Sequence, residues 1–373
     1  MKIKYNILVL AVISTTFLFC GKRADTNANT SLSLAKDTIQ KKDSVEKVIE
    51  ADTSEYESLE RVARITKNVV NPKSVIISPD GRYAYVNDLE GMNTMILSTE
   101  NFEVVSNIKH TGKPVEFGIT GGGRYIWISY FRLLEKGYPK ELGDERSYKY
   151  NSVVVVYDTL EKGFVNRFEV GIIPKVIAVS PDEKLILVAN WRSASVSVIN
   201  TDSNKVIRTI KVGAIPRGIK FTRDSKYAYV CNFGGSTISK INIENLEVEK
   251  TITNVGYKPR DIVIRKDMKY AYFSNFGDGM LRKMDLETDK VVDKVKIGTE
   301  PRSICITNND KYVFATNYQS GTVSVIDTET FEVIDEVRSD VGAVGVALTP
   351  DMKYLWVTNQ KSASIIVYKI NYK

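Results

Sequence analysis

A regular alternation of apolar and polar positions recurs along the chain from about residue 59 to its end. One phrase marks each copy: a short apolar run rich in Tyr, Val and Ala, then Asn, a loop, and a second alternating run. Alternation with a period of two is typical of half-buried β-strands. The seven copies place this phrase at residues 88, 130, 190, 232, 275, 317 and 359, so the spacing is 42 or 43 residues with one interval of 60.

Each copy contains four strand signals, and turn-forming residues separate the first two. Ser78-Pro79-Asp80-Gly81 is one such turn, and Gly121-Gly122-Gly123 occupies the same place in the second copy. Asp favours these turns by bonding its own backbone, and Pro presets φ. Because no helix pattern follows the three glycines, they indicate a hairpin turn and not a phosphate loop. Four short strands in each repeat predict an all-β, seven-bladed β-propeller of four-stranded antiparallel blades.

The two ends of the repeat region indicate how the ring closes. The last copy stops after its third strand signal, Ser364–Ile370, while an additional strand pattern, Leu59–Thr66, precedes the first copy. A strand left at the edge of a sheet exposes unpaired backbone groups. The sequence therefore predicts that the N-terminal strand completes the last blade.

The repeat resembles the YVTN family of β-propellers, whose phrase is present as Trp356-Val357-Thr358-Asn359. The second marker of that family, Gly-x-x-Pro before the first strand, is present as Gly171…Pro174 and Gly213…Pro216, among others. The resemblance covers about residues 59–373. It implies the propeller fold and leaves function open, because the family is functionally mixed.

The N-terminus has the features of an export signal. A basic start precedes a largely apolar run from Ile7 to Phe19, which is the size of a signal-peptide core. Residues 17–21, Phe-Leu-Phe-Cys-Gly, resemble the lipobox of bacterial lipoproteins, although Phe19 stands where a small residue is usual. We predict a signal peptide over residues 1–19, a lipidated Cys20 with a polar tether over 20–57, and a propeller over 58–373. An ordinary secretory signal is the alternative.

The amino-acid composition argues against several kinds of metal-binding and catalytic site and against a disulfide framework. The single histidine, His110, excludes His-rich zinc sites and disfavours catalytic triads and haem ligation, and three cysteines cannot build a disulfide framework. Cys231 and Cys305 are expected to be small buried residues, and His110 is expected on a surface turn. No acidic cluster has metal-ligand spacing, although carboxylates from separate blades could still converge. We predict no cofactor, no metal and no catalytic residue.

The charge is uneven, and its excess lies in the repeats. The net charge is +7, and residues 1–57 sum to zero with 8 Lys/Arg and 8 Asp/Glu. Basic residues fill five of the seven positions that follow the Pro of the loop between copies: Lys73, Val115, Lys175, Arg217, Arg260, Arg302 and Val346. Aromatic residues fill five of the seven positions that follow the phrase: Leu89, Phe131, Trp191, Phe233, Phe276, Tyr318 and Gln360.

Both sets of positions belong to loops that share one face of a propeller. In propellers of the family that this repeat resembles, the first strand of each blade is innermost, so the basic residues are expected around the mouth of the central channel. A ring of cations beside aromatic rings suits an anion, a polar glycan or a flexible nucleic acid. The alternative is that the basic residues form salt bridges between blades and the aromatic residues only pack loops. An insertion of 18 residues within 131–150 lies on the same face, as a lid, a partner contact or a decorated loop.

These observations predict a monomeric, lipid-anchored protein of the cell envelope that binds a partner without catalysis. The partner would be an envelope or host macromolecule, and nucleic acid is less favoured. Two other classes stay open: a propeller hydrolase or lactonase-like enzyme, and a structural subunit of the envelope.

Overall fold

The structure is a computed structural model of the chain, and it describes residues 55–133 and 152–373. The predicted signal peptide, Cys20, nearly all of the tether and most of the insertion at 131–150 lie outside the described residues. Ala51–Lys373 form one compact unit. Nowhere in the described residues does a helix reach the length and apolar character needed to cross a bilayer.

Seven four-stranded antiparallel sheets make up this unit, and each sheet is one blade. The first four blades are β2 (Pro72–Ile77), β3 (Tyr83–Asp88), β4 (Asn93–Ser98) and β5 (Val104–Lys109); β6 (Gly112–Thr120), β7 (Tyr125–Leu133), β8 (Ser152–Asp158) and β9 (Gly163–Val170); β10 (Pro174–Val179), β11 (Leu185–Asn190), β12 (Ser195–Asn200) and β13 (Lys205–Lys211); and β14 (Pro216–Phe221), β15 (Tyr227–Asn232), β16 (Thr237–Asn242) and β17 (Glu247–Ile252). The last three are β18 (Pro259–Ile264), β19 (Tyr270–Asn275), β20 (Met280–Asp285) and β21 (Lys290–Lys296); β22 (Pro301–Ile306), β23 (Tyr312–Asn317), β24 (Thr322–Asp327) and β25 (Val333–Arg338); and β26 (Ala343–Leu348), β27 (Tyr354–Asn359), β28 (Ser364–Tyr372) and β1 (Tyr56–Ile65).

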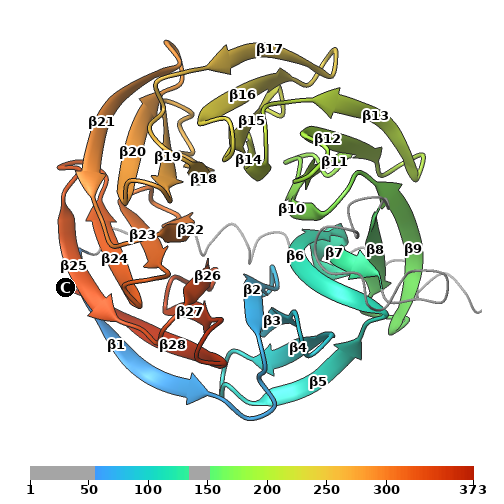
Figure 1. Cartoon of the computed structure of the whole chain (residues 1–373). Coiled ribbons are helices and arrows are strands. Elements are labelled where there is room, and N and C mark those ends of the chain that lie inside the picture. The colour runs from blue at the N-terminus through green and yellow to red at the C-terminus, as the bar shows by residue number, and fades with distance from the viewer. Residues whose placement is uncertain (1–54, 134–151) are drawn as a thin grey trace, which may run out of the picture. The chain divides into compact units, whose positions relative to one another are not determined.

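The blades form a closed ring with their first strands innermost (Figure 1). The innermost strands contact one another in cyclic order, β2, β6, β10, β14, β18, β22 and β26, and β26 contacts β2 again. Among the described residues the helical structure is one short 3₁₀ turn, η2 (Gly121–Gly123), which joins β6 to β7. The predicted seven-bladed propeller and the hairpin turn at the three glycines are both confirmed.

The apolar phrase of each repeat becomes the second strand of a blade, and it is buried on both faces. On β11 the alternate residues enter two different cores: Leu187 packs toward the next blade with Phe221, while Ile186 and Val188 pack with Trp127 of the preceding blade. Each second strand is therefore apolar at nearly every position. The outer strands, such as β13, expose most of their residues to solvent.

The turn between the first two strands is held by its own polar side chains. The Ser78 hydroxyl donates to Asp80 Oδ1 (2.6 Å) and accepts from the Tyr83 amide (3.0 Å). The next turn position has a positive φ, which Gly81 adopts freely and which non-glycine residues adopt in other blades, Glu183 among them. In five blades a Ser or Thr hydroxyl donates to the Asp or Asn side chain two residues on. The predicted bond of the turn Asp to its own backbone is confirmed, since Asp80 Oδ1 accepts from the Arg82 amide at 3.1 Å and four other blades repeat this bond with Asp.

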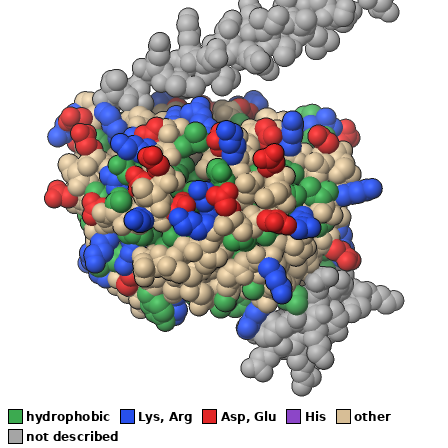
Figure 2. Space-filling model, turned by 90° about the horizontal axis from the view of Figure 1, so that it is seen from above, with side chains coloured by type: hydrophobic (Ala, Val, Ile, Leu, Met, Phe, Trp, Pro, Cys, Tyr) green, Lys and Arg blue, Asp and Glu red, His purple; other side chains and the backbone are tan. Residues whose placement is uncertain are grey.

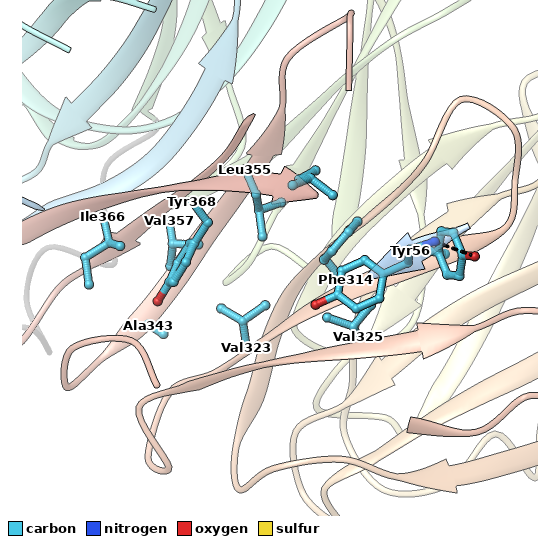
Figure 3. Packing of buried hydrophobic residues seen from close by; sticks show 11 residues of the cluster. Tyr56, Phe314, Val323, Val325, Ala343, Leu355, Val357, Ile366 and Tyr368 are labelled. Atoms are coloured by element: carbon cyan, nitrogen blue, oxygen red, sulfur yellow. Dashed lines mark hydrogen bonds between the residues drawn. The ribbon is translucent and has the colours of Figure 1, made fainter. Parts of the chain in front are cut away.

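The N-terminal strand closes the ring as predicted. β1 pairs antiparallel with β28, with Leu59 opposite Ile370 and Ile65 opposite Ile365. Tyr56, at the start of β1, packs beside Phe314 of the preceding blade (Figure 3), and its amide donates to the Tyr312 hydroxyl at 3.0 Å. No blade of the described unit is left with three strands.

His110 corrects one prediction. It was expected on a surface turn, but it is only 8% exposed. Its Nε2 lies 2.7 Å from the Thr94 hydroxyl and its Nδ1 lies 2.9 Å from the Tyr130 hydroxyl, and Phe164 packs against the ring. The segment joining β5 to β6 is covered by aromatic residues from the second blade, which the local sequence does not reveal. Of the two described cysteines, Cys231 is buried as expected and Cys305 is half-buried.

Candidate functional site

The five basic residues predicted as a site all follow the first residue of an innermost strand. In each case that first residue is a Pro paired with the last residue of the second strand, as Pro216 pairs with Asn232. The regular pairing then breaks, so Arg217 and its counterparts lie in a β-bulge. A bulge redirects a side chain relative to the sheet. The register also corrects the last blade: Ala343 takes the Pro position, so the residue equivalent to Arg217 is Val344 and not Val346.

These residues converge, and we call them the axial cation cluster: Lys73, Lys175, Arg217, Arg260 and Arg302. Lys73 and Arg260 are only 7% and 8% exposed, and the other three are half-buried. Lys73 and Arg260, which were expected around the mouth of the central channel, are therefore buried.

Burial and like charges within the cluster lower the pKa values of several of its members. Burial lowers the pKa of Lys73 well below its ordinary value, and the positive charges of Arg260, Arg302 and Lys175 lower it further. Lys175 is affected in the same way, first by burial and then by Arg217, Arg260 and Arg302. Burial, with the charge of Arg302, lowers the pKa of Arg217 to about 10. The five side chains thus form one coupled group drawn from five blades.

No ion pair joins the cluster to a carboxylate within the part of the chain that the structure describes. None of the five cations has a carboxylate oxygen within 4.0 Å there. The Nε atoms of Arg217 and Arg302 are buried with no acceptor. Within residues 55–133 and 152–373, none of the ion pairs expected under the alternative reading involves these five residues. A buried charge without a partner costs several kcal/mol, so the arrangement is expensive for the protein alone.

Two carboxylates and one further lysine lie near the cluster, and the sequence analysis missed them. Glu116 follows Val115, and burial raises its pKa although Lys73 opposes the shift. Burial also raises the pKa of Asp261, whose two oxygens accept hydrogen bonds from the amides of Ile262 and Ile304, both at 3.0 Å. Lys220 interacts electrostatically with Asp261. Glu116 and Asp261 each come directly after the position that was analysed, and that adjacency is the signal that could have found them.

The predicted aromatic residues lie against the cations. Lys175 Nζ is 4.0 Å from the centroid of the Phe131 ring, and the Arg302 guanidinium is 3.4 Å from that of Tyr318. Arg217 lies between Trp191 (5.4 Å) and Phe233 (5.3 Å).

The centroid of the Phe276 ring lies 5.7 Å from the guanidinium carbons of both Arg260 and Arg302. The Phe276 ring also contacts Phe233, with ring centroids 5.4 Å apart. Cation–π contacts of this kind hold a desolvated cation in place. The rings therefore serve first to position the protein's own cations. Lys73 is the exception. The position that is aromatic in most blades is Leu89 in its own blade and Gln360 in the last blade, which precedes it in the ring.

Hydroxyl side chains from the neighbouring blade fix the backbone of the cluster. Ser129 donates to the carbonyl of Lys175 (2.7 Å), Ser274 to that of Arg302 (2.8 Å) and Thr358 to that of Lys73 (3.3 Å). Ser274 and Thr358 stand just before the last residue of their second strands, and Ser129 stands at the equivalent position of β7, just before Tyr130, which pairs with Pro114. The repeated Ser/Thr of the phrase therefore ties one blade to the cation of the next blade.

The recurring Asn of the phrase has a structural role. The Asn190 amide donates to the hydroxyls of Ser195 (3.1 Å) and Ser197 (2.9 Å), and Asn232 and Asn317 make the same pair of bonds in their own blades. A Cβ at Gly171 would lie 2.6 Å from Asn190 Cγ, so the Gly-x-x-Pro glycine leaves room for this side chain. The two sequence markers therefore depend on each other through this contact.

The fold defines the class of the protein as a seven-bladed β-propeller, and its innermost strands carry a group of cations without ion pairs among the described residues. A family model described as Cytochrome D1 heme domain, which is a β-propeller family, matches residues 261–349, about a quarter of the chain. Among solved structures, hydrazine synthase of Kuenenia stuttgartiensis is similar with a TM-score of 0.70 and 17% identity, over 82% of this chain and 97% of that one. This likeness shows a shared fold. No curated protein matches the chain.

Proposed function

We propose that this protein is a non-catalytic binding protein of the cell envelope, anchored by a lipid on Cys20, that holds an anionic ligand at the axial cation cluster. The observation that supports it best is the convergence of five cations, two of them buried, without a paired carboxylate among the described residues. The apolar run before Cys20 and the YVTN-like repeat support the envelope assignment.

The physical argument concerns the cost of the cluster. Like charges that are crowded and desolvated destabilise the folded state, and salt screens them only partly over about 8–10 Å. Natural sequences keep such local conflicts mainly at functional sites. A bound anion removes the repulsion and supplies the missing acceptors to Arg217 Nε and Arg302 Nε.

The binding proposal is tested with polygalacturonate and heparin as polyanion probes. Arg260→Ala should weaken binding of whichever polymer binds by at least tenfold, and the loss should shrink as salt is raised. Lys205→Met is the matched control, because Lys205 is an exposed cation on the outer strand β13. Equal loss in both variants would reduce the effect to net charge. Ester or lactone hydrolysis that Arg260→Ala abolishes would overturn the non-catalytic proposal in favour of the enzyme alternative.

The anchor is tested separately. Cys20→Ala should move the protein from the membrane fraction into a soluble extracytoplasmic fraction, because one residue carries the proposed lipid. Detergent-phase partitioning of Cys20→Ala equal to that of the wild type would contradict the lipid anchor and would leave the propeller proposal unaffected.

The histidine and the cysteines that the structure describes are poorly suited to ligate the iron of the haem named in the matching family model. The single histidine, His110, has both ring nitrogens engaged by Thr94 and Tyr130. Burial raises the pKa of the thiols of Cys231 and Cys305, which disfavours the thiolate that an iron ligand requires. We therefore route no chemistry through a haem.

A further inference from the structure

We propose that the ligand of the axial cation cluster is a compact phosphate group carrying two or more negative charges, such as a pyrophosphate or a phosphate monoester terminus, and not a polymer stacked on aromatic rings. This inference rests on the proposed function and deepens it by naming the ligand chemistry. Three features of the cluster support it: the occupied aromatic faces, the radial arrangement of donors, and the charge balance.

The aromatic rings contact the protein's own cations. Arg217 approaches both Trp191 and Phe233, and Arg302 lies 3.4 Å from the centroid of Tyr318. A sugar or base that stacked on these rings would have to displace a guanidinium, which would then lose its cation–π contact. The recognition elements left for a ligand are the N–H groups of the cations.

Those N–H groups come from five of the seven blades, the first and the third to the sixth. An anion on the ring axis is therefore approached from several directions at once. A carboxylate has two oxygens in one plane, whereas a terminal phosphate has three oxygens that point in different directions. Arginine forks match phosphate oxygens bidentately, and the cluster contains three arginines. A tetrahedral oxyanion thus satisfies more of these donors than a carboxylate does.

The charge balance favours a multivalent group. Three arginines and, when protonated, Lys73 and Lys175 are opposed by Glu116 and by Asp261, and the oxygens of Asp261 already accept two amide hydrogen bonds. A dianion or trianion compensates this excess where a single carboxylate does not. Because burial and like charges lower the pKa of Lys73 and Lys175, a bound anion should raise both pKa values again. Binding should therefore be accompanied by proton uptake.

The experiment is isothermal titration calorimetry of the compact unit, residues 51–373, with pyrophosphate at pH 8 in two buffers of different ionisation enthalpy. We expect saturable binding with net proton uptake, and binding of malonate, a compact dicarboxylate, at least tenfold weaker. Lys73→Met should reduce both the affinity, by about 10–100-fold, and the proton uptake, since a charge-assisted hydrogen bond is worth about 1.5–3 kcal/mol. Lys205→Met should change neither. Circular dichroism verifies that both variants are folded, and Lys175→Met replaces Lys73→Met if the latter does not fold.

The outcomes separate the two levels of the argument. If the polymers bind in an Arg260-dependent way but pyrophosphate does not, the compact-phosphate inference is overturned and the proposed function stands. If malonate binds as tightly as pyrophosphate, the inference is overturned in the same way. If neither the polymers nor pyrophosphate bind, the proposed function itself fails.

Discussion

Charged side chains are arranged differently in two regions of the ring: the closing seam, where β1 pairs with β28, and the axial cation cluster. At the seam, Arg61 and Arg64 of β1 both contact Asp340, at 3.1 Å and 2.7 Å, and Ser364 also donates to that carboxylate at 2.6 Å. At the axis, the five cations have no carboxylate within ion-pair distance among the described residues, although they are more buried than Arg61 and Arg64. The partly exposed arginines of β1 are therefore paired with a carboxylate, whereas the more buried cations of the axial cluster have no such partner among the described residues.

The ion pairs of the seam contribute to the stability of the fold, whereas the axial cluster is the region to which we assign a binding function. Exposed or half-exposed pairs each contribute about 0–1 kcal/mol, and they specify which strand closes the last blade. The outer wall follows the same rule, with basic and acidic side chains intermixed (Figure 2). The axial cluster departs from it, and a cluster that does not stabilise the fold is the part of the molecule that needs an explanation from binding.

The largest expected effect comes from removing the seam. A protein that begins at residue 66 lacks β1, so the last blade has three strands and the ring is open. We expect loss of cooperative unfolding, or a fall in the melting temperature of at least ~10 °C, corresponding to about 5 kcal/mol or more. Thermal melts followed by circular dichroism measure this change. A protein that begins at Ala51 is the control, and equal melting temperatures for the two would refute the closure.

The contribution of side-chain packing to the seam can be tested at one residue, Tyr56. Tyr56 is buried against Tyr312 and Phe314, and its hydroxyl donates to Asp335 at 2.5 Å. Tyr56→Ala should lower the free energy of unfolding by about 3–5 kcal/mol through the cavity left behind. Tyr56→Phe keeps the ring and should cost only about 1–2 kcal/mol, for the lost hydrogen bond. Urea denaturation compares the two, and equal losses would contradict a packing role.

His110 gives a third case: a buried titratable side chain whose two ring nitrogens both have hydrogen-bonding partners. Burial lowers its pKa to about 4, below the value of about 6.5 in an unfolded chain. The unfolded state therefore binds a proton that the native state does not as pH falls from about 6.5 to about 4. Stability should fall in that window by up to about 3 kcal/mol relative to His110→Gln, which lacks the titration. The measurement is the melting temperature of both proteins between pH 7.5 and 4.5, and parallel curves would contradict the burial of a neutral His110.

The smallest effects give the sharpest contrast, because they should have opposite signs. Asp340→Asn removes the acceptor shared by Arg61 and Arg64 and should destabilise the protein by about 1 kcal/mol. Arg260→Met removes a buried, unpaired charge and should leave the stability of the ligand-free protein unchanged or raise it by about 1 kcal/mol. Urea denaturation at low salt measures both. Destabilisation of both variants by equal amounts would show that Arg260 has a partner in the fold.

The sequence alone determined the architecture. The 42-residue period, the apolar second strand and the Ser/Thr-x-Asp turns are local signals, and each appears in the structure where the pattern placed it. The spare strand pattern at 59–66 predicted the closing strand and missed only its first residues, since β1 begins at Tyr56. These features are readable because alternation and turn chemistry act between residues that are close in the sequence.

Only the tertiary structure decided how the candidate site is built. The sequence located its basic and aromatic residues, but it could not show that Lys73 is buried, that Arg217 lies between Trp191 and Phe233, or that the cations lack carboxylate partners. The same holds for His110, which aromatic residues of the second blade cover. Burial and ion pairing depend on distances between side chains from different blades, about one repeat or more apart in sequence, and those distances are fixed only when the ring closes.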